Sequence, residues 1–250
     1  MTTAKQANDI AKLSEAIEAS RHLCVFSGAG ISCPSGIPDF RSEKGLYRQK
    51  SGSGRRPEEI ISHSFFCAHP AEFYAFYREK MVYPNAKPNA AHRYFAALEE
   101  SGKRVSVVTQ NIDGLHQAAG SREVYELHGS VHRNFCTRCG RFYGLAEVMQ
   151  MDGIPRCTSD GAIIKPDVVL YEEPLDETVV AGAVRAIMEA DTMIVVGTSL
   201  VVYPAAAYVQ RFQGRMLALV NLSETPYDER ADLAIHGDIV EIVEALLHTR

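Results

Sequence analysis

The chain has 250 residues, 46% of them hydrophobic, and a formal net charge of −5 at pH 7. This length can bury the core of one or two domains, and the acidic balance argues against a dedicated nucleic-acid-binding protein, which would present a basic face. We expect no membrane partner, because no stretch is apolar over the roughly 20 residues that a spanning helix needs. Residues 1–20 have helical spacing and mixed charge rather than the apolar centre of a signal peptide, so we expect a cytoplasmic protein.

Short apolar runs typical of β-strands alternate with helical patterns along the chain. The strand-like runs are residues 22–26, 105–109, 124–127, 193–196, 217–221 and 239–242, and helical patterns include 90–100, 177–190 and 204–212. This alternation predicts an α/β fold, with a parallel sheet covered by helices on both faces.

Two stretches interrupt that alternation. Residues 42–88 begin with a Gly/Ser/Arg-rich loop and then become aromatic and helical, and residues 131–162 carry cysteines with short polar spacers. We expect these two stretches to build a small second module, while residues 1–41, 89–130 and 163–250 form the larger domain.

The first strand-like run leads into Ser27-Gly28-Ala29-Gly30, a turn that lets backbone N–H groups approach a pyrophosphate. The turn is an incomplete G-x-G-x-x-G pattern, because Cys33 occupies the third glycine position. Such turns also occur where a strand and a helix pack closely. No acidic residue that could bind a ribose follows about 20 positions later, which disfavours an ordinary dehydrogenase.

Polar residues follow other strand-like runs as well. Gln110, Asn111 and Asp113 come after residues 105–109, where they could bind a ribose and an amide, and Asn111 or Asp113 could also cap a helix beginning at Gly114. Gly197-Thr198-Ser199 and Asn221-Leu222-Ser223 follow two further runs and suit a nucleotide's ribose and phosphate, although each could be only a turn.

His128, followed by Gly129, lies at the end of another strand-like run, where an imidazole titrating near neutrality could act as a general base. A lone histidine is more often structural. We assign that structural role to His116, and a surface or packing role to His63, His69 and His92.

The six cysteines do not resemble those of a secreted domain. Cys24, Cys33 and Cys67 are interpreted as separate reduced thiols, whereas Cys136, Cys139 and Cys157 have a spacing that a reducing compartment usually reserves for metal.

These segments, taken together and in this order, resemble the sirtuin family of NAD-dependent protein deacylases over nearly the whole chain. The matching stretches are GAGIS at 28–32, GIPDFRS at 36–42, TQNIDGLHQAAG at 109–120, ELHG at 126–129, KPDVV at 165–169, GTSLVVYPAA at 197–206 and NLSETP at 221–226. The resemblance implies a large Rossmann-like NAD-binding domain and a small module made of a helical insertion and a zinc ribbon. NAD and acyl-lysine would meet in the cleft between them.

The resemblance also implies roles for individual residues. Ala29 and Gly30 with their neighbours would hold phosphate; Asp39, Phe40 and Arg41 would reach the reacting ribose; Gln110, Asn111 and Asp113 would position nicotinamide and the ribose hydroxyls. His128 would be the general base, with Asn111 and Asp113 as further catalytic residues. The implied NAD-binding set also contains Gly28, Ser32, Ile112, Gly197, Thr198, Ser199, Asn221, Leu222, Ser223, Asp238 and Ile239.

In the reaction that the resemblance implies, the acyl oxygen of the modified lysine attacks C1′ of the ribose as nicotinamide leaves. His128 then takes a proton from a ribose hydroxyl, and the products are free lysine and O-acetyl-ADP-ribose when the acyl group is acetyl. The acetylated protein or peptide would lie extended between two segments, contacting Val168, Val169, Leu170 and Tyr171 in one and Val201 and Tyr203 in the other. Both segments could instead be plain β-core. Family members commonly have Phe-Gly-Glu where this chain has Tyr171-Glu172-Glu173.

Two departures from the family pattern concern the small module. The zinc ribbon should have a second C-x2-C pair, but Asp160 stands at its last position, so we expect a structural Zn²⁺ held by Cys136, Cys139, Cys157 and Asp160. Water or His132 as the fourth ligand, or a ribbon without metal, are the alternatives. In desuccinylase-type sirtuins a Tyr and an Arg three residues later bind the acyl carboxylate. Here Arg78 comes four residues after Tyr74, which would turn it away from the pocket on a helix, so we favour acetyl and other uncharged acyl groups.

Three other functions compete with deacylation. Mono-ADP-ribosyl transfer would need the same NAD-binding residues, a non-catalytic NAD-binding or zinc-ribbon interaction module would need no base such as His128, and a dehydrogenase is disfavoured by the broken glycine pattern.

Overall fold

The structure is a computed structural model that describes residues 4–39, 45 and 54–248. Its larger sheet has six strands in the order β3-β2-β1-β7-β8-β9, and every neighbouring pair is parallel. The strands are β1 (His22–Ser27), β2 (Arg104–Thr109), β3 (Val124–Glu126), β7 (Thr192–Val196), β8 (Met216–Asn221) and β9 (Leu233–His236). The predicted parallel sheet is confirmed.

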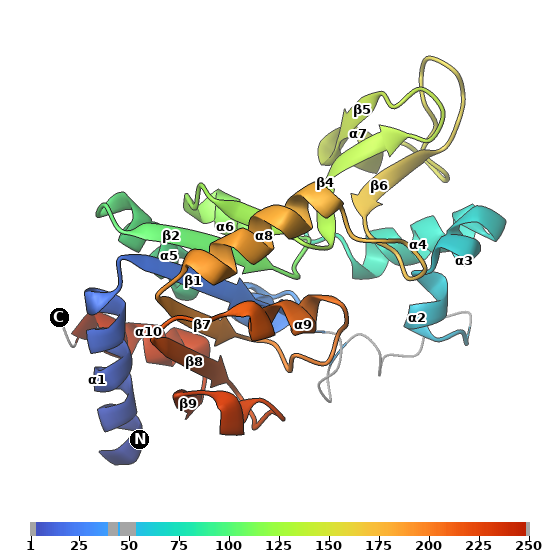
Figure 1. Cartoon of the computed structure of the whole chain (residues 1–250). Helices are drawn as coiled ribbons and strands as arrows, with labels where there is room; N and C mark the ends of the chain where they lie inside the picture. Colours follow the sequence, from blue (N-terminus) through green and yellow to red (C-terminus); the bar gives the residue numbers. More distant parts are fainter. Residues whose placement is uncertain (1–3, 40–44, 46–53, 249–250) are drawn as a thin grey trace.

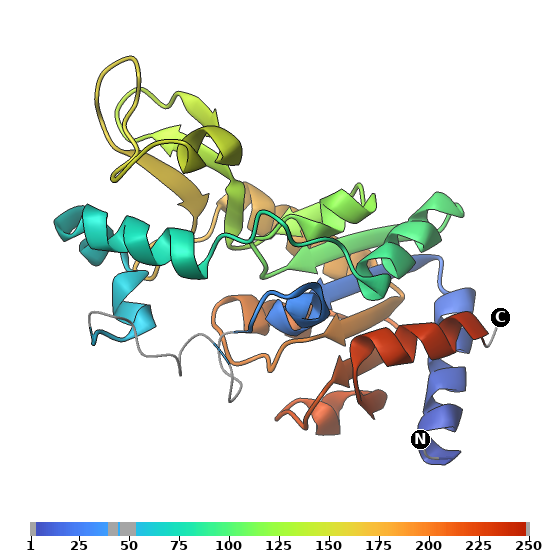
Figure 2. The same cartoon turned by 180° about the vertical axis from the view of Figure 1, so that it is seen from behind.

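Helices cover both faces of this sheet, and the strand residues alternate between two cores. Leu23 and Val25 of β1 pack with residues of α1 (Ala4–Ala19), α5 (Ala90–Glu100) and α10 (Ile239–His248). Cys24 and Phe26 point to the other face, against α8 (Glu177–Glu189) and α9 (Ala205–Tyr208). Figure 1 shows α8 and α9 on one face, and α10 lies on the opposite face in Figure 2. All strand residues of β1 are buried, as an apolar parallel strand between two helical layers requires.

The sequence prediction failed at the last strand. Residues 239–242 begin the helix α10, in which Ile239, Ile242, Val243 and Leu246 are buried at helical spacing. A short apolar run does not distinguish a strand from a buried helical turn, and the strand β9 that precedes it was not predicted. The predicted helix at 204–212 is divided into α9 and a 3₁₀ turn, η3 (Val209–Arg211). The remaining short elements are η1 (Ala29–Ser35), α6 (Leu115–Ala119) and η4 (Asp228–Arg230).

A second group of elements lies at the end of the molecule away from both termini (Figure 1). It contains α2 (Pro57–Ile60), α3 (His63–Ala68), α4 (Pro70–Lys80), α7 (Leu145–Met149) and an antiparallel sheet of β5 (Phe142–Gly144), β4 (Gly129–Cys136) and β6 (Ile164–Val168). β6 pairs with β4 rather than with the large sheet. The division into two modules remains a prediction. Because β6 pairs with β4, we would end the second segment of the small module after Val168 and not after residue 162.

The chain order reverses around β1, which has β2 on one side and β7 on the other. Ligands of open α/β sheets bind at such a switch point, beyond the carboxyl ends of the strands. Here the turn after β1 packs directly on the turn after β7: Gly28 N–H donates to Val196 O at 3.0 Å, and Gly30 N–H donates to Gly197 O at 2.8 Å.

Among the described residues, no helix is both long and apolar enough to cross a membrane.

The two glycines of the first turn are required by this backbone contact. A Cβ on Gly28 would lie 2.6 Å from the Cβ of Thr198, and a Cβ on Gly30 would lie 2.7 Å from the Cα of Gly197. Gly197 itself has φ of +63°, in the left-handed region. The protein's own packing therefore accounts for the G-x-G pattern, the alternative that the sequence left open beside pyrophosphate binding.

We expect Gly30→Ala to lower the melting temperature by roughly 2–12 °C, because the added methyl group must displace backbone and overpacking costs about 1–3 kcal/mol. Gly144→Ala is the matched control, since a Cβ there would make only an ordinary contact, at 3.5 Å. Thermal unfolding followed by circular dichroism measures both. Equal melting temperatures for the two variants would contradict the packing argument.

Candidate active site

A cleft of about 640 Å³ lies beyond the carboxyl ends of β1, β2, β7 and β8, and the small module forms its other side. Most residues predicted to bind NAD or peptide line it: Ala29, Gly30, Ser32, Asp39, Gln110, Asn111, Ile112, Asp113, His128, Val168, Val169, Leu170, Tyr171, Gly197, Thr198, Ser199, Tyr203, Asn221, Leu222, Ser223, Asp238 and Ile239. Gly28, which is buried, and Val201, which is exposed, are not among the lining residues. Phe40 and Arg41 are outside the described residues.

Asn111 and Asp113 are fixed by hydrogen bonds at the end of β2. The Asn111 side-chain amide donates to Gly28 O and to Ser32 Oγ, each at 3.1 Å. Ser32 Oγ donates in turn to Asp113 Oδ2 at 2.6 Å. Asp113 Oδ1 accepts from the backbone N–H of Leu115, the first residue of α6, at 2.9 Å, but the N-cap position is Gly114 and has no side-chain cap, so neither Asn111 nor Asp113 is the predicted cap. Burial raises the pKa of Asp113, and the bonds from Ser32 and Leu115 oppose that rise.

Two amide side chains in the cleft have donors without partners. Gln110 Oε1 accepts from Thr198 Oγ1, and Asn221 Oδ1 accepts from Thr198 N, both at 2.9 Å. The other ends, Gln110 Nε2 and Asn221 Nδ2, are buried and have no hydrogen-bond partner among the described residues. A buried unpaired donor costs about 1–3 kcal/mol. The site therefore favours a ligand with acceptor oxygens, such as a nucleotide.

His128 is held with one ring nitrogen committed. Its Nδ1 donates to Gln110 O at 2.9 Å, which leaves the Nε2 lone pair available as a base. Burial lowers the pKa of His128 below 6.5, although the bond to Gln110 raises it in part. The imidazole is thus neutral at pH 7, the state that a general base needs.

The metal cluster predicted from the cysteines forms in the small module. The ligand atoms of Cys136, Cys139, Cys157 and Asp160 all lie within 4.8 Å of one another. Tetrahedral zinc sets neighbouring sulfur and oxygen ligands about 3.5–3.8 Å apart. The Cys139 and Cys157 sulfurs are 3.7 Å apart, and the Cys136 sulfur is 3.4 Å from Asp160 Oδ1. The cluster therefore fits a structural zinc site.

Hydrogen bonds around the cluster favour the ionised form of the Cys157 thiol, whereas the pKa of the Cys139 thiol, lowered by a backbone hydrogen bond at Arg141, is raised overall to about 11 by the side chains of Cys136, Cys157 and Asp160. Backbone N–H groups of Arg138 and Ser159 donate to the sulfurs of Cys136 and Cys157, each at 3.4 Å. The Tyr143 hydroxyl donates to Cys157 Sγ at 3.2 Å and lowers the pKa of this thiol to about 7. His132 does not belong to the cluster, because its Nε2 lies 2.9 Å from Asp113 O, beside the cleft.

Comparison with known proteins agrees with this geometry. Residues 28–204 match the model of the Sir2 family. An NAD-dependent protein deacetylase of Clostridium perfringens is 53% identical over 235 residues, covering 94% of this chain and 96% of the relative, and one of Cutibacterium acnes is 51% identical over the same length, with the same coverage. The chain belongs to the Sir2 family.

Solved Sir2 structures superpose over almost the full length. One, with a deacetylated p53 peptide and 3′-O-acetyl ADP-ribose, has a TM-score of 0.87 at 39% identity and covers 96% of this chain and 97% of its own. Another, of Sir2 with a p53 peptide and NAD⁺, has a TM-score of 0.83 at 40% identity and covers 95% and 96%. The predicted Rossmann-like fold is therefore confirmed.

Backbone hydrogen bonds to the rest of this Sir2 chain fix the segment that was predicted to bind peptide. Val169 N–H donates to His128 O, and Tyr171 N–H donates to Ile61 O, both at 3.0 Å. Tyr171 is 41% exposed, and across the cleft Val201 and Tyr203 are 40% and 66% exposed. Apolar side chains thus border the cleft on both sides.

Glu172, at the position where family members commonly have glycine, adopts the glycine-like conformation with φ of +77°. Its carboxylate accepts from Ser64 N and Ser64 Oγ, both at 2.9 Å. The left-handed conformation costs a non-glycine residue about 1–2 kcal/mol, and these two bonds offset that cost by tying the segment to α3.

The aromatic helix α4 packs in the core of the small module, and Arg78 is held by backbone carbonyls. Tyr74 and Tyr77 are fully buried, and Tyr74 OH donates to Ile164 O. Arg78 donates to the carbonyl oxygens of Met151 and Gly153, each at 2.6 Å. Arg78 therefore links α4 to the segment after α7.

Several cleft residues were not predicted. Cys33, which was interpreted as a separate reduced thiol at the interrupted glycine position, lines the cleft. So do Lys80, the last residue of α4, and Tyr83 just beyond it, as well as Glu224 and Thr225 after β8. Their positions depend on how the small module meets the large sheet, and no local pattern carries that information. Only NLSETP at 221–226 could have pointed to Glu224 and Thr225.

We expect the protein to bind one zinc ion per chain, and Asp160→Ala to lose it because a three-thiolate site lacks its fourth protein ligand. Asp160→Cys should keep zinc at higher chelator concentrations than the wild type, since thiolate is the softer ligand. Metal analysis after dialysis against increasing chelator measures this, with the exposed Asp152→Ala as the control. Wild-type protein without zinc, or zinc content equal in Asp160→Ala and Asp160→Cys, would contradict the site.

Proposed function

We propose that this chain is an NAD-dependent protein lysine deacetylase, which converts acetyl-lysine and NAD to lysine, nicotinamide and O-acetyl-ADP-ribose. One observation carries the proposal: a neutral imidazole and two amide donors meet in one cleft, and neither the imidazole Nε2 nor the two donors have a hydrogen-bond partner among residues 4–39, 45 and 54–248. The relatives named NAD-dependent protein deacetylases support it.

Residues at the switch point would hold NAD. The backbone around Ala29 and Gly30 and the hydroxyls of Ser199 and Ser223 suit its phosphates, and the free donors of Gln110 and Asn221 suit its amide and ribose oxygens. NAD supplies an electrophilic ribose carbon from which nicotinamide leaves. The proposed set also keeps Gly28, Phe40 and Arg41, as the family resemblance implies.

The catalytic roles follow from the hydrogen bonds. His128 Nε2 would accept a proton from a ribose hydroxyl, while Gln110 O keeps the ring oriented through Nδ1. Asn111, fixed through Gly28 O and Ser32 Oγ, and Asp113 would position the ribose. A prearranged polar site of this kind lowers the reorganisation needed during reaction.

The acetylated protein would enter as an extended strand between residues 168–171 and 200–203, which makes backbone hydrogen bonds the main source of affinity. Acetyl and other uncharged acyl groups are favoured, because Tyr74 is buried and Arg78 is engaged with backbone carbonyls. We further propose a cytoplasmic location and no nucleic-acid partner, on the basis of the separate free thiols and the net charge of −5.

We expect mass spectrometry to detect NAD-dependent loss of acetyl from an acetyl-lysine peptide, together with acetyl-ADP-ribose. His128→Ala should lower kcat/KM at least about 100-fold, since loss of a general base costs 10²–10⁴ in rate. His248→Ala, in the last turn of α10, is the control and should leave the rate unchanged. If the peptide stayed intact while the protein gained ADP-ribose mass, mono-ADP-ribosyl transfer would replace this proposal.

The pH dependence gives a second test. Because burial lowers the pKa of His128 from 6.5, the free enzyme keeps the neutral base below that pH and loses it only on further acidification. We expect the acidic limb of kcat/KM to have its midpoint below pH 6.5. Rates measured from about pH 5 to about pH 8, with circular dichroism to monitor folding, test this. A midpoint above 6.5 would exclude His128 as the base in this environment.

A further inference from the structure

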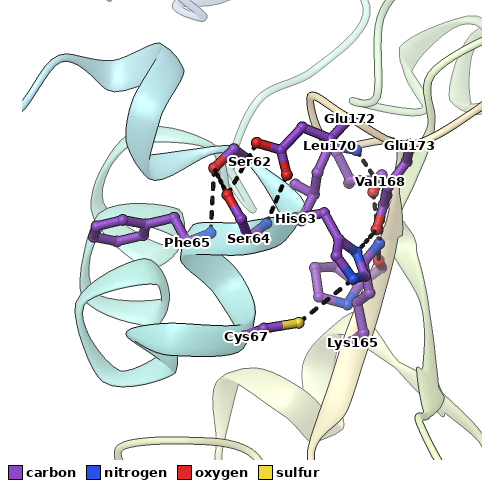
Figure 3. A network of polar contacts seen from close by, with 11 residues as sticks. Ser62, His63, Ser64, Phe65, Cys67, Lys165, Val168, Leu170, Glu172 and Glu173 are labelled. Carbon is purple, nitrogen blue, oxygen red and sulfur yellow. Dashed lines mark hydrogen bonds and ion pairs between the residues drawn. The ribbon is translucent and has the colours of Figure 1, made fainter.

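A second polar cluster lies outside the cleft, where α3 meets the segment after β6. His63 and Cys67 are four residues apart on α3, so their side chains share one face of the helix. Figure 3 shows Cys67, His63 and Glu173 in sequence, with the imidazole between the thiol and the carboxylate. Cys67 Sγ is 3.4 Å from His63 Nε2, and His63 Nδ1 is 2.7 Å from Glu173 Oε1.

The contacts determine which ring nitrogen carries the proton. An ionised carboxylate only accepts hydrogen bonds, so the neutral imidazole donates from Nδ1 to Glu173. Its Nε2 then presents a lone pair to the Cys67 thiol. A nucleophile, a base and a group that orients the base are thus arranged in the order found in cysteine-histidine active sites.

The carboxylate is itself held in place. Glu173 Oε2 accepts from Leu170 N at 2.8 Å and from Lys165 Nζ at 3.0 Å. Partial burial alone would raise the pKa of Glu173, but hydrogen bonds from Leu170, His63 and Lys165 lower it overall, so the group stays ionised at neutral pH. The base therefore has a fixed partner and a fixed tautomer.

Cys67 is also accessible, unlike the other isolated thiols. Cys24 is buried and Cys33 half-buried, whereas Cys67 is exposed. Cys33 donates to Ala29 O at 3.6 Å, and burial raises the pKa of its thiol. A shallow cavity of about 520 Å³, lined by His63, Lys165 and Glu173 among others, lies on the Glu173 side of the cluster, and Cys67 itself is not part of its lining.

We propose that Cys67 is a nucleophilic thiol, activated by His63 and Glu173, that exchanges with small-molecule disulfides. His63 Nε2 takes the thiol proton, and the Cys67 thiolate attacks one sulfur of the disulfide RSSR. A bond forms between Cys67 and that sulfur, the S–S bond breaks, and the other RS⁻ leaves with the proton from His63 as RSH. The Cys67 sulfur is oxidised, the leaving sulfur is reduced, and the product is a mixed disulfide.

The modification would act on substrate binding, and this consequence rests on the proposed function. The His63–Glu173 contact joins α3 to residues 170–173, and His63 N–H also donates to Tyr171 O at 3.0 Å. Residues 168–171 form one side of the proposed peptide site. A group attached to Cys67 replaces the thiol hydrogen that His63 Nε2 accepts and adds bulk next to the His63 ring. The modification should therefore weaken the contact between α3 and residues 170–173 and raise the KM for peptide.

The test uses the full-length protein and the neutral probe 2-hydroxyethyl disulfide, without NAD or peptide. Peptide mapping by mass spectrometry follows the modification rate of each cysteine. We expect Cys67 to react at least about tenfold faster than Cys33, and His63→Gln to slow Cys67 at least about tenfold while Cys33 is unchanged. Glu173→Gln should slow Cys67 as well, and His69→Gln, an exposed histidine next to the end of α3, is the matched control.

A merely structural role for His63 would leave the pH dependence of the Cys67 rate unchanged in His63→Gln, whereas a base role shifts it upward. Equal Cys67 rates in the wild type and His63→Gln would overturn the proposal. A second measurement compares peptide KM before and after modification and after reduction, with Cys67→Ser as the insensitive variant. An unchanged KM would overturn the link to substrate binding. Because the rate test needs no deacetylase activity, its failure and that of the proposed function are distinguishable.

Discussion

The contact between the turns after β1 and β7 is the constraint on which the site depends. Gly28 and Gly30 reach Val196 and Gly197 through backbone hydrogen bonds, and side chains at either glycine would separate the two strands' ends. Because the turns touch, Asn111 reaches Gly28 O and Thr198 reaches Gln110 across the switch point. Widening this contact would separate the groups that line the cleft.

The oxygen and nitrogen atoms of the polar side chains around the cleft have different roles. Oxygen atoms of Gln110, Asn221 and Asp113 accept bonds from the protein itself, which fixes their side chains. The amide nitrogens of Gln110 and Asn221 have no hydrogen-bond partner within the described part of the chain. A folded protein keeps such donors only where something else stabilises them, and a polar ligand is the simplest partner. Fixed acceptors and free donors on the same side chains therefore combine rigidity with affinity.

Much of the site could be predicted because its polar residues directly follow apolar strands, and the carboxyl ends of parallel strands meet at one edge of a sheet. Gln110, His128, Thr198 and Asn221 were found in this way. The reason for the glycines could not be read from the sequence, since a close backbone contact and a phosphate site require the same residue.

Contacts between distant parts of the chain could not be predicted from the sequence either. Glu173 lies 110 residues from His63, and nothing local to either residue indicates that they meet. Lys80 and Tyr83 enter the cleft through the placement of the small module. The apolar run at 239–242 was misassigned because its helical spacing becomes evident only over the longer stretch to Leu246.

A neutral polar support lies beneath the loop after β2, which carries Asn111. His116 Nε2 bonds Ser27 Oγ at 2.9 Å, Ser27 donates to Thr109 Oγ1 at 2.9 Å, and Thr109 Oγ1 accepts from Asn111 N at 3.0 Å. Burial lowers the pKa of His116 to about 3 and that of its ring neighbour His92 to about 4. Both rings are therefore neutral at pH 7. The folding stability that depends on these neutral rings is lost only as the pH falls below 6.5, the pKa of histidine in the unfolded chain. A charged ring here would add positive potential beneath Asn111, so the neutral histidines support the loop without adding charge beneath the cleft.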